Sequence, residues 1–155
     1  MMLGGNLRGK TVAVLGLTFK PNTDDMREAP SIHLITALQD LGANVRVFDP
    51  VGMEQAKKVL NGVTYSSGPY DCATKASALV IVTEWEQFRA LDLGRMRDLM
   101  ACPVMVDLRN VYRPEDMKNH GFAYTCIGRA PTHQAANVQV PSGRARSLST
   151  AGAGR

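Results

Sequence analysis

The sequence has few of the features of a secreted, membrane-spanning or metal-binding protein. No apolar run approaches the roughly 18 residues of a membrane span, and residues 1–10 lack the apolar stretch of a secretory signal. The three cysteines, Cys72, Cys102 and Cys126, are widely spaced, which fits neither a disulfide framework nor a C-x-x-C metal site. We therefore expect a cytoplasmic protein with no membrane partner and no metal, in which each cysteine is a small buried side chain.

Acidic residues are missing from the end of the chain. The whole sequence has 18 Lys and Arg against 14 Asp and Glu, a formal charge of +4. Residues 131–155 contain three arginines and no acid, so removing them leaves +1 for the rest. Because the basic charge lies largely in this segment and not on one face of a domain, we expect no nucleic-acid partner.

Large apolar side chains are also scarce in this last segment. Residues 131–155 are polar, small and rich in Pro, Gly and Ser, a composition that cannot bury enough apolar area to offset chain entropy. The rest of the 155-residue chain is long enough for one domain with a real core. We predict a single domain over residues 1–130 and a disordered tail over residues 131–155.

Short β-rich runs alternate with amphipathic segments within the predicted domain. Strands are predicted at residues 10–15, 44–48, 63–65, 78–83, 104–107 and 122–127. Helices are predicted at residues 30–41, 53–60, 70–76, 86–100 and 114–119. Strands alternating with helices pair in parallel through right-handed crossovers. The pattern predicts an α/β fold, a Rossmann-like three-layer sandwich with a six-stranded, mostly parallel sheet and helices on both faces.

The turn after the first predicted strand, "GLTFKPNTDDMREAPS", lacks the second and third glycines of a dinucleotide fingerprint. Lys20 and Arg27 stand there instead, and both suit an anion because lysine offers a mobile charge and arginine a planar fork. Asp24 and Asp25 either contribute to the site or, as we favour, cap the turn or pair with Lys20 and Arg27. We expect Lys20 and Arg27 to bind a ligand.

Three later loops also follow apolar strands, and ligands of open parallel sheets bind beyond the carboxyl ends of strands. Arg109 follows the strand that ends at Asp107, which favours a ligand contact, with an Asp107–Arg109 surface pair as the alternative. Asp49 stands where a dinucleotide fold has its ribose-binding acid, but the Asp-Pro step fits a turn equally well. Trp85 is either a stacking platform or a packed aromatic at the rim.

Taken together in chain order, these segments resemble the C-terminal, UDP-binding domain of the UDP-glucose 6-dehydrogenase family, within the UDP-glucose/GDP-mannose dehydrogenase superfamily. The resemblance covers about residues 3–129 and includes "GKTVAVLGLTFKPNTDDMREAPS", "VRVFDP", "LVIVTEWEQF" and "VMVDLRNVYRP". It implies that full-length members oxidise UDP-glucose to UDP-glucuronate with NAD⁺ through a covalent cysteine intermediate, in an active site between this domain and an N-terminal NAD-binding domain.

The resemblance also implies roles for individual residues. Phe19 and Lys20 match positions that contact the UDP-sugar, Arg109 matches a substrate-binding arginine, and Arg27 matches a position that reaches NAD⁺. The implied partners are UDP-glucose and the N-terminal NAD-binding half, in cis or in trans, and the complete enzyme is expected to be a homo-oligomer.

The sequence departs from the family in two respects. It contains no N-terminal dinucleotide fingerprint, and none of its cysteines lies in the family's "GGSCFPKD"-type context. Covalent catalysis needs that thiol beside the substrate, so we assign no catalytic residue and expect this chain alone to be inactive. A stand-alone nucleotide-sugar-binding module and an inactive gene fragment remain alternatives, and a generic NAD-binding Rossmann domain is disfavoured by the missing glycines.

Overall fold

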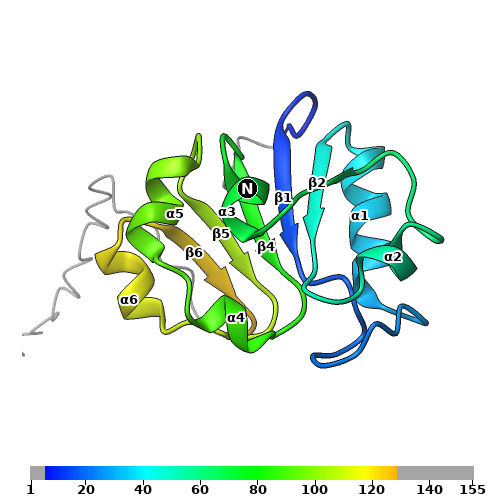
Figure 1. Cartoon of the computed structure of the whole chain (residues 1–155). Coiled ribbons are helices and arrows are strands. Elements are labelled where there is room, and N and C mark those ends of the chain that lie inside the picture. The colour runs from blue at the N-terminus through cyan, green and yellow to red at the C-terminus, as the bar shows by residue number, and fades with distance from the viewer. Residues whose placement is uncertain (1–5, 129–155) are drawn as a thin grey trace, which may run out of the picture.

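The computed structural model describes residues 6–128, which form one six-stranded sheet (Figure 1). The strands are β1 (Thr11–Leu15), β2 (Asn44–Phe48), β3 (Thr64–Tyr65), β4 (Ala78–Ile81), β5 (Val104–Asp107) and β6 (Ala123–Cys126). Their order is β3-β2-β1-β4-β5-β6, and every neighbouring pair is parallel. The predicted parallel sheet is confirmed, whereas the predicted tail and the boundary before it lie outside the described residues.

Helices cover both faces of this sheet, which confirms the three-layer prediction. The helices are α1 (Pro30–Asp40), α2 (Met53–Ala56), α3 (Pro69–Ala73), α4 (Glu86–Arg89), α5 (Leu93–Leu99) and α6 (Pro114–Asn119). The first two pack on one face and the other four on the opposite face. The change of face comes at the crossover from β3 to β4, which runs from the edge of the sheet to its centre. None of the described helices is long and apolar enough to cross a membrane.

The sheet separates two hydrophobic cores because successive strand residues point to opposite faces. On one face Val12 and Val14 of β1 pack in the same cluster as Ile35 of α1. On the other face Ala13 and Leu15 belong to the cluster formed with α3, α4, α5 and α6. The central strands β1 and β4 are therefore buried on both sides, as expected for parallel strands in a three-layer fold.

The single helix predicted at residues 86–100 is wrong, because two helices, α4 and α5, occupy this segment. Asp92 interrupts it: its side chain accepts a hydrogen bond from the backbone N–H of Arg95 at 3.0 Å and caps the start of α5. Phe88, Leu91 and Met96 are nevertheless all buried. The apolar spacing also indicated Leu99 as a core contact, but Leu99 is only partly buried. The spacing was thus right for three of four core contacts and concealed the break. The helix predicted at residues 53–60 is also too long, because α2 ends at Ala56 and continues only as turns.

The cysteines differ in their burial. Cys72 of α3 is fully buried beside β1, with its Sγ 3.9 Å from the carbonyl oxygen of Val14. Burial raises the pKa of the Cys72 thiol to about 12. Cys126 is buried as well, whereas Cys102 is only partly buried. The expectation of buried cysteines is therefore confirmed for Cys72 and Cys126 and is wrong for Cys102.

We predict that a disulfide reagent such as DTNB modifies Cys102 before Cys72 in the folded protein at about pH 8. The thiolate is the reactive form, and a thiol with a raised pKa stays protonated until the pH rises toward that pKa. The reaction is quenched at several times and the peptides are analysed by mass spectrometry, which gives the rate of modification at each cysteine. Cys102→Ser is the control and should remove the first phase. Equal rates at Cys72 and Cys102 in the native protein would contradict the prediction.

Candidate functional site at the carboxyl edge of the sheet

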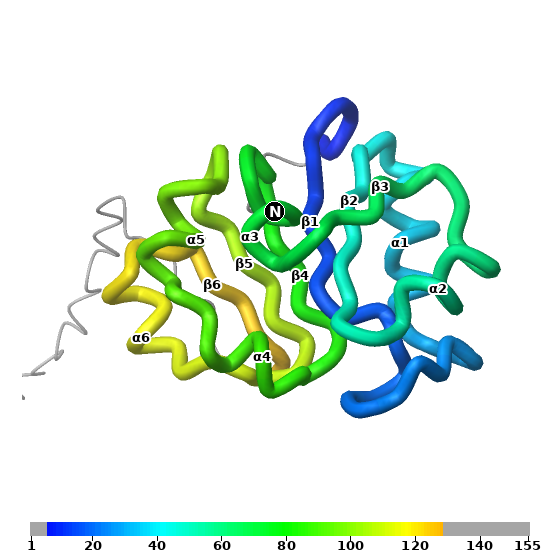
Figure 2. Tube along the Cα trace, in the orientation of Figure 1, coloured from blue at the N-terminus to red at the C-terminus, as the bar shows by residue number. Residues whose placement is uncertain are grey.

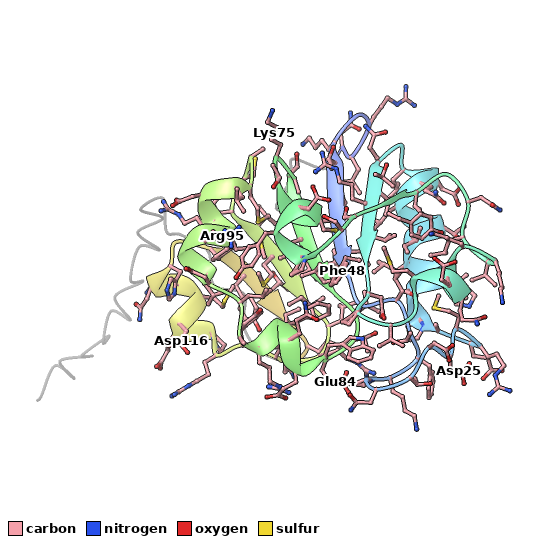
Figure 3. The ribbon with its side chains drawn as sticks, in the orientation of Figure 1. Asp25, Phe48, Lys75, Glu84, Arg95 and Asp116 are labelled. Carbon is pink, nitrogen blue, oxygen red and sulfur yellow. The ribbon has the colours of Figure 1, made fainter. Side chains whose placement is uncertain are left out.

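The loops that follow β1, β2, β4 and β5 meet at one edge of the sheet, where the carboxyl ends of the parallel strands lie (Figure 2). β1 and β4 are neighbours there, but the chain continues from β1 toward β2 and from β4 toward β5. This is the topological switch point, at which open α/β sheets bind ligands. Figure 3 shows Asp25 and Glu84 at this edge and Lys75 at the opposite one.

Asp49, which follows β2, joins the loops at the switch point. Its side chain is buried, and the residue is 1% exposed. Its carboxylate accepts hydrogen bonds from five N–H groups on three loops: the backbone of Leu17 (2.8 Å), Thr18 (3.1 Å), Val51 (3.0 Å) and Gly52 (2.7 Å), and the indole of Trp85 (3.1 Å). Both carboxylate oxygens are thereby used within the protein, so Asp49 shapes the loops and does not present an acid to a ribose.

Trp85 is the packed rim aromatic of the two alternatives. It is 6% exposed, and its indole nitrogen donates to Asp49. A buried ring with its only polar atom already bonded offers no face on which a ligand could stack. The stacking interpretation of Trp85 is wrong.

The first residues after β1 pack directly against the loop after β4. Gly16 has φ +90°, and a Cβ there would lie 2.6 Å from the Cβ of Thr83, so only glycine fits. The hydroxyl of Thr83 donates to the carbonyl oxygen of Thr18 at 2.7 Å. This packing holds the start of the loop, whereas Phe19 and Lys20, directly beyond it, are exposed.

Asp25 and Arg27, further along this loop, form an ion pair with two hydrogen bonds. Arg27 Nε lies 3.1 Å from Asp25 Oδ1, and Arg27 Nη2 lies 3.0 Å from Asp25 Oδ2. The Arg27 guanidinium lowers the pKa of the Asp25 carboxyl below its usual value. The favoured pairing of Asp25 is thus confirmed. Because the Arg27 side chain is 89% exposed, water screens the pair, and separating it costs little.

Two hollows adjoin this ion pair. The larger, of about 510 Å³, lies between the loop after β1 and α2 and is lined by Thr23, Asp24, Asp25, Met26, Arg27, Gln55, Lys58 and Val59. The smaller, of about 350 Å³, is lined by Phe19, Asp25, Arg27 and Glu28. Arg27 therefore lines both hollows and Phe19 lines one, whereas neither Lys20 nor Arg109 lines either of them.

Arg109, in the loop after β5, pairs with Glu84 in the loop after β4. Arg109 Nε lies 2.7 Å from Glu84 Oε2, and the two side chains are 37% and 34% exposed. Asp107 is fully buried and accepts instead from the backbone N–H of Arg109 at 3.0 Å and of Val111 at 2.7 Å. The alternative of an Asp107–Arg109 surface pair is therefore wrong. Sequence reasoning gave Glu84 no role, although its place directly after a buried strand beside β5 was a usable signal.

The four residues predicted to bind ligands all belong to carboxyl-edge loops. Phe19, Lys20 and Arg27 lie in the loop after β1, and Arg109 lies in the loop after β5. β4 runs between these two strands, so the loops are separated by two strand spacings, about 10 Å. The two groups of side chains thus flank the switch point.

The histidines of the described part of the chain occupy ordinary surface positions. His33 is exposed on α1, and the Nδ1 of His120 lies 2.8 Å from the carbonyl oxygen of Asp116, one turn earlier at the end of α6. Among residues 6–128 no three His, Cys, Asp or Glu side chains are grouped so as to hold a metal ion.

Comparison with known proteins relates the chain to one family of dehydrogenases. Residues 13–114 match the model of the UDP-glucose/GDP-mannose dehydrogenase family, UDP binding domain. The UDP-glucose 6-dehydrogenases of Rhizobium meliloti (strain 1021) and Rickettsia typhi are 55% and 40% identical over 126 and 129 residues, 81% and 82% of this chain. These regions are only 29% and 30% of the two relatives, so the chain spans less than a third of their length.

Solved structures agree with this relationship. A UDP-glucose dehydrogenase from Pyrobaculum islandicum is 36% identical with a TM-score of 0.64, over 78% of this chain and 26% of that one. An NDP-N-acetyl-D-galactosaminuronic acid dehydrogenase from Methanosarcina mazei Go1 is 31% identical with a TM-score of 0.70, over 82% and 26%. The resemblance inferred from the sequence motifs, to a C-terminal UDP-binding domain, is confirmed.

We predict that Asp49→Asn lowers the free energy of unfolding by about 2–4 kcal/mol, because the amide turns one acceptor into a donor that faces N–H groups. Urea denaturation followed by circular dichroism measures the change. Asp40→Asn, at the exposed end of α1, is the control and should change stability by less than about 0.5 kcal/mol. If the two variants are equally stable, Asp49 does not hold the loops together.

Proposed function

The chain belongs to the UDP-glucose/GDP-mannose dehydrogenase family as its UDP binding domain, and we propose that it binds the UDP-sugar substrate of an NAD-dependent UDP-glucose 6-dehydrogenase. The complete enzyme would convert UDP-glucose to UDP-glucuronate in the cytoplasm. The observation that supports this most strongly is the extent of the family match, because residues 13–114 include every loop at the switch point.

The side chains at this edge have the chemistry that a nucleotide diphosphate sugar requires. Lys20 is exposed, and within residues 6–128 the Arg109 guanidinium donates no side-chain hydrogen bond, so both retain N–H donors for phosphate oxygens or sugar hydroxyls. Phe19, 47% exposed beside Lys20, adds an apolar ring for a base or a sugar face. Charged side chains would thus take the place of the glycine-rich backbone cradle.

Arg27 is the residue of this chain that we assign to NAD⁺. Its weakly held, exposed guanidinium fits an anionic group of the cofactor, but the loop lacks the glycines that would let the backbone surround a pyrophosphate. One arginine contact therefore fits the residues present, and a complete NAD⁺ site does not. When NAD⁺ is bound, its nicotinamide accepts a hydride. The NAD-binding half that holds it would act in cis or in trans. The complete enzyme would be a homo-oligomer.

We predict that Lys20→Ala and Arg109→Ala each weaken UDP-glucose binding about ten- to a hundredfold, the value of a charge-assisted contact to phosphate or hydroxyl. Lys20 is exposed, so Lys20→Ala should keep the melting temperature of the wild type. Arg109→Ala removes the cation beside the buried Glu84 Oε2, so this variant should melt somewhat lower but still fold. NMR titration at high ligand concentration and thermal unfolding on the same samples measure both quantities.

Lys75→Ala is the matched control, because it removes the same charge at the opposite edge of the sheet (Figure 3). It should titrate like the wild type. The assigned site is wrong if Lys20→Ala and Arg109→Ala also titrate like the wild type, and the side chains are structural if the two variants unfold.

We also predict that the purified 155-residue chain forms no NADH from UDP-glucose and NAD⁺. None of its cysteines lies in the nucleophile context of the family, and hydride transfer needs a bound nicotinamide. Absorbance at about 340 nm, where the reduced nicotinamide ring absorbs, monitors NADH. Steady NADH formation that depends on UDP-glucose and survives repurification would show that this chain contains the catalytic groups.

A further inference from the structure

The Glu84–Arg109 pair has an unusual acceptor. Glu84 Oε2 is closed off from solvent and accepts no hydrogen bond from the described residues, although Arg109 Nε lies 2.7 Å away. The contact is thus an ion pair and not a hydrogen bond. A buried carboxylate oxygen that contacts neither water nor a hydrogen-bond donor is unfavourable in free energy unless a cation lies beside it. Glu84 therefore stabilises the Arg109 guanidinium in its present position.

The backbone of Glu84 is fixed on both sides. Its predecessor, Thr83, is fully buried and donates to the carbonyl oxygen of Thr18, and its successor, Trp85, donates to Asp49. Both bonds tie the loop after β4 to the neighbouring loops at the switch point. Glu84 therefore presents its carboxylate from a stretch of chain that is held on both sides.

The other arginine pair of this edge is built differently. Arg27 spends two N–H donors on hydrogen bonds to Asp25 and is almost fully exposed. Arg109 is about two-thirds covered and spends none of its side-chain donors on hydrogen bonds within residues 6–128. Asp25 accepts two hydrogen bonds from Arg27. Glu84 instead holds Arg109 by an ion pair and leaves the N–H donors of Arg109 for a ligand.

We propose that Glu84 is a positioning residue: it holds the Arg109 guanidinium at the switch point so that its N–H donors meet the UDP-sugar. This inference rests on the proposed function, because it presumes that Arg109 contacts that ligand. The proposal adds Glu84 to the site as a residue that affects ligand binding only through Arg109.

The sign of one mutational effect separates positioning from simple electrostatics. Removing a negative charge near an anionic diphosphate would strengthen binding if Glu84 only neutralised Arg109. Loss of positioning would weaken it. We expect Glu84→Gln to bind UDP-glucose about three- to tenfold more weakly than the wild type. Glu84→Asp keeps the charge but shortens the reach, and it should weaken binding as well. Glu86→Gln, an equal charge change on an exposed side chain two residues away, should have no effect.

The experiment is an NMR titration of each variant of the full chain with UDP-glucose, with the melting temperature and the Arg109 Nε–Hε resonance measured on the same samples. The proposal expects that resonance to shift in Glu84→Gln, and Glu84→Gln to cost nothing further in an Arg109→Ala background. Tighter binding by Glu84→Gln, or an undiminished effect in the Arg109→Ala background, overturns the positioning role. If Glu84→Gln does not fold, the same criteria apply to Glu84→Asp.

Failure of the proposed function gives a different result. If the wild type shows no saturable shifts with UDP-glucose, or if Arg109→Ala binds normally, the proposed site is wrong and the role of Glu84 is wrong with it. If the wild type binds and Arg109→Ala weakens binding but both Glu84 variants bind like the wild type, only the positioning role is overturned.

Discussion

The buried carboxylate of Asp49 is the interaction on which the carboxyl edge of the sheet depends. It gathers N–H groups from the loops after β1, β2 and β4, so three segments distant in sequence take their positions from one side chain. Backbone N–H groups buried without a partner are costly, and the carboxylate supplies their acceptor. The adjoining Thr83–Thr18 hydrogen bond and the close approach at Gly16 complete a rigid base.

In the proposed site, this rigid base would let a small number of side chains serve as the binding groups. In a fingerprint loop, glycines allow the backbone itself to surround a phosphate. Here the backbone N–H groups of Leu17 and Thr18 are already bonded to Asp49, so they are not offered to a ligand. In the proposed site, an anion would then be recognised by side chains such as Lys20 and Arg109. The strength of their contacts with the ligand would depend on how firmly the loops hold them.

The two arginines at this edge, Arg27 and Arg109, differ in burial. Arg27 is exposed and paired with a neighbour in its own loop, so the pair is screened and easily exchanged. Arg109 is partly covered and paired across to another loop, so its partner is fixed by the sheet. Under the proposed function, Arg27 would make its contact only when the cofactor arrives, whereas Arg109 would be in place before the ligand binds. The difference arises because the partner of Arg27 lies in the same loop, whereas the partner of Arg109 lies in the loop after the neighbouring strand β4.

The sequence by itself determined the alternation of strands and helices, the parallel sheet, and the placement of Lys20, Arg27 and Arg109 in loops after strands, because local periodicity and turn chemistry specify these features. It left Asp49 and Trp85 open and gave Glu84 no role. Their functions depend on contacts between residues more than 20 positions apart, which no local pattern encodes. Only the tertiary structure, through the order of the strands, brought these side chains together.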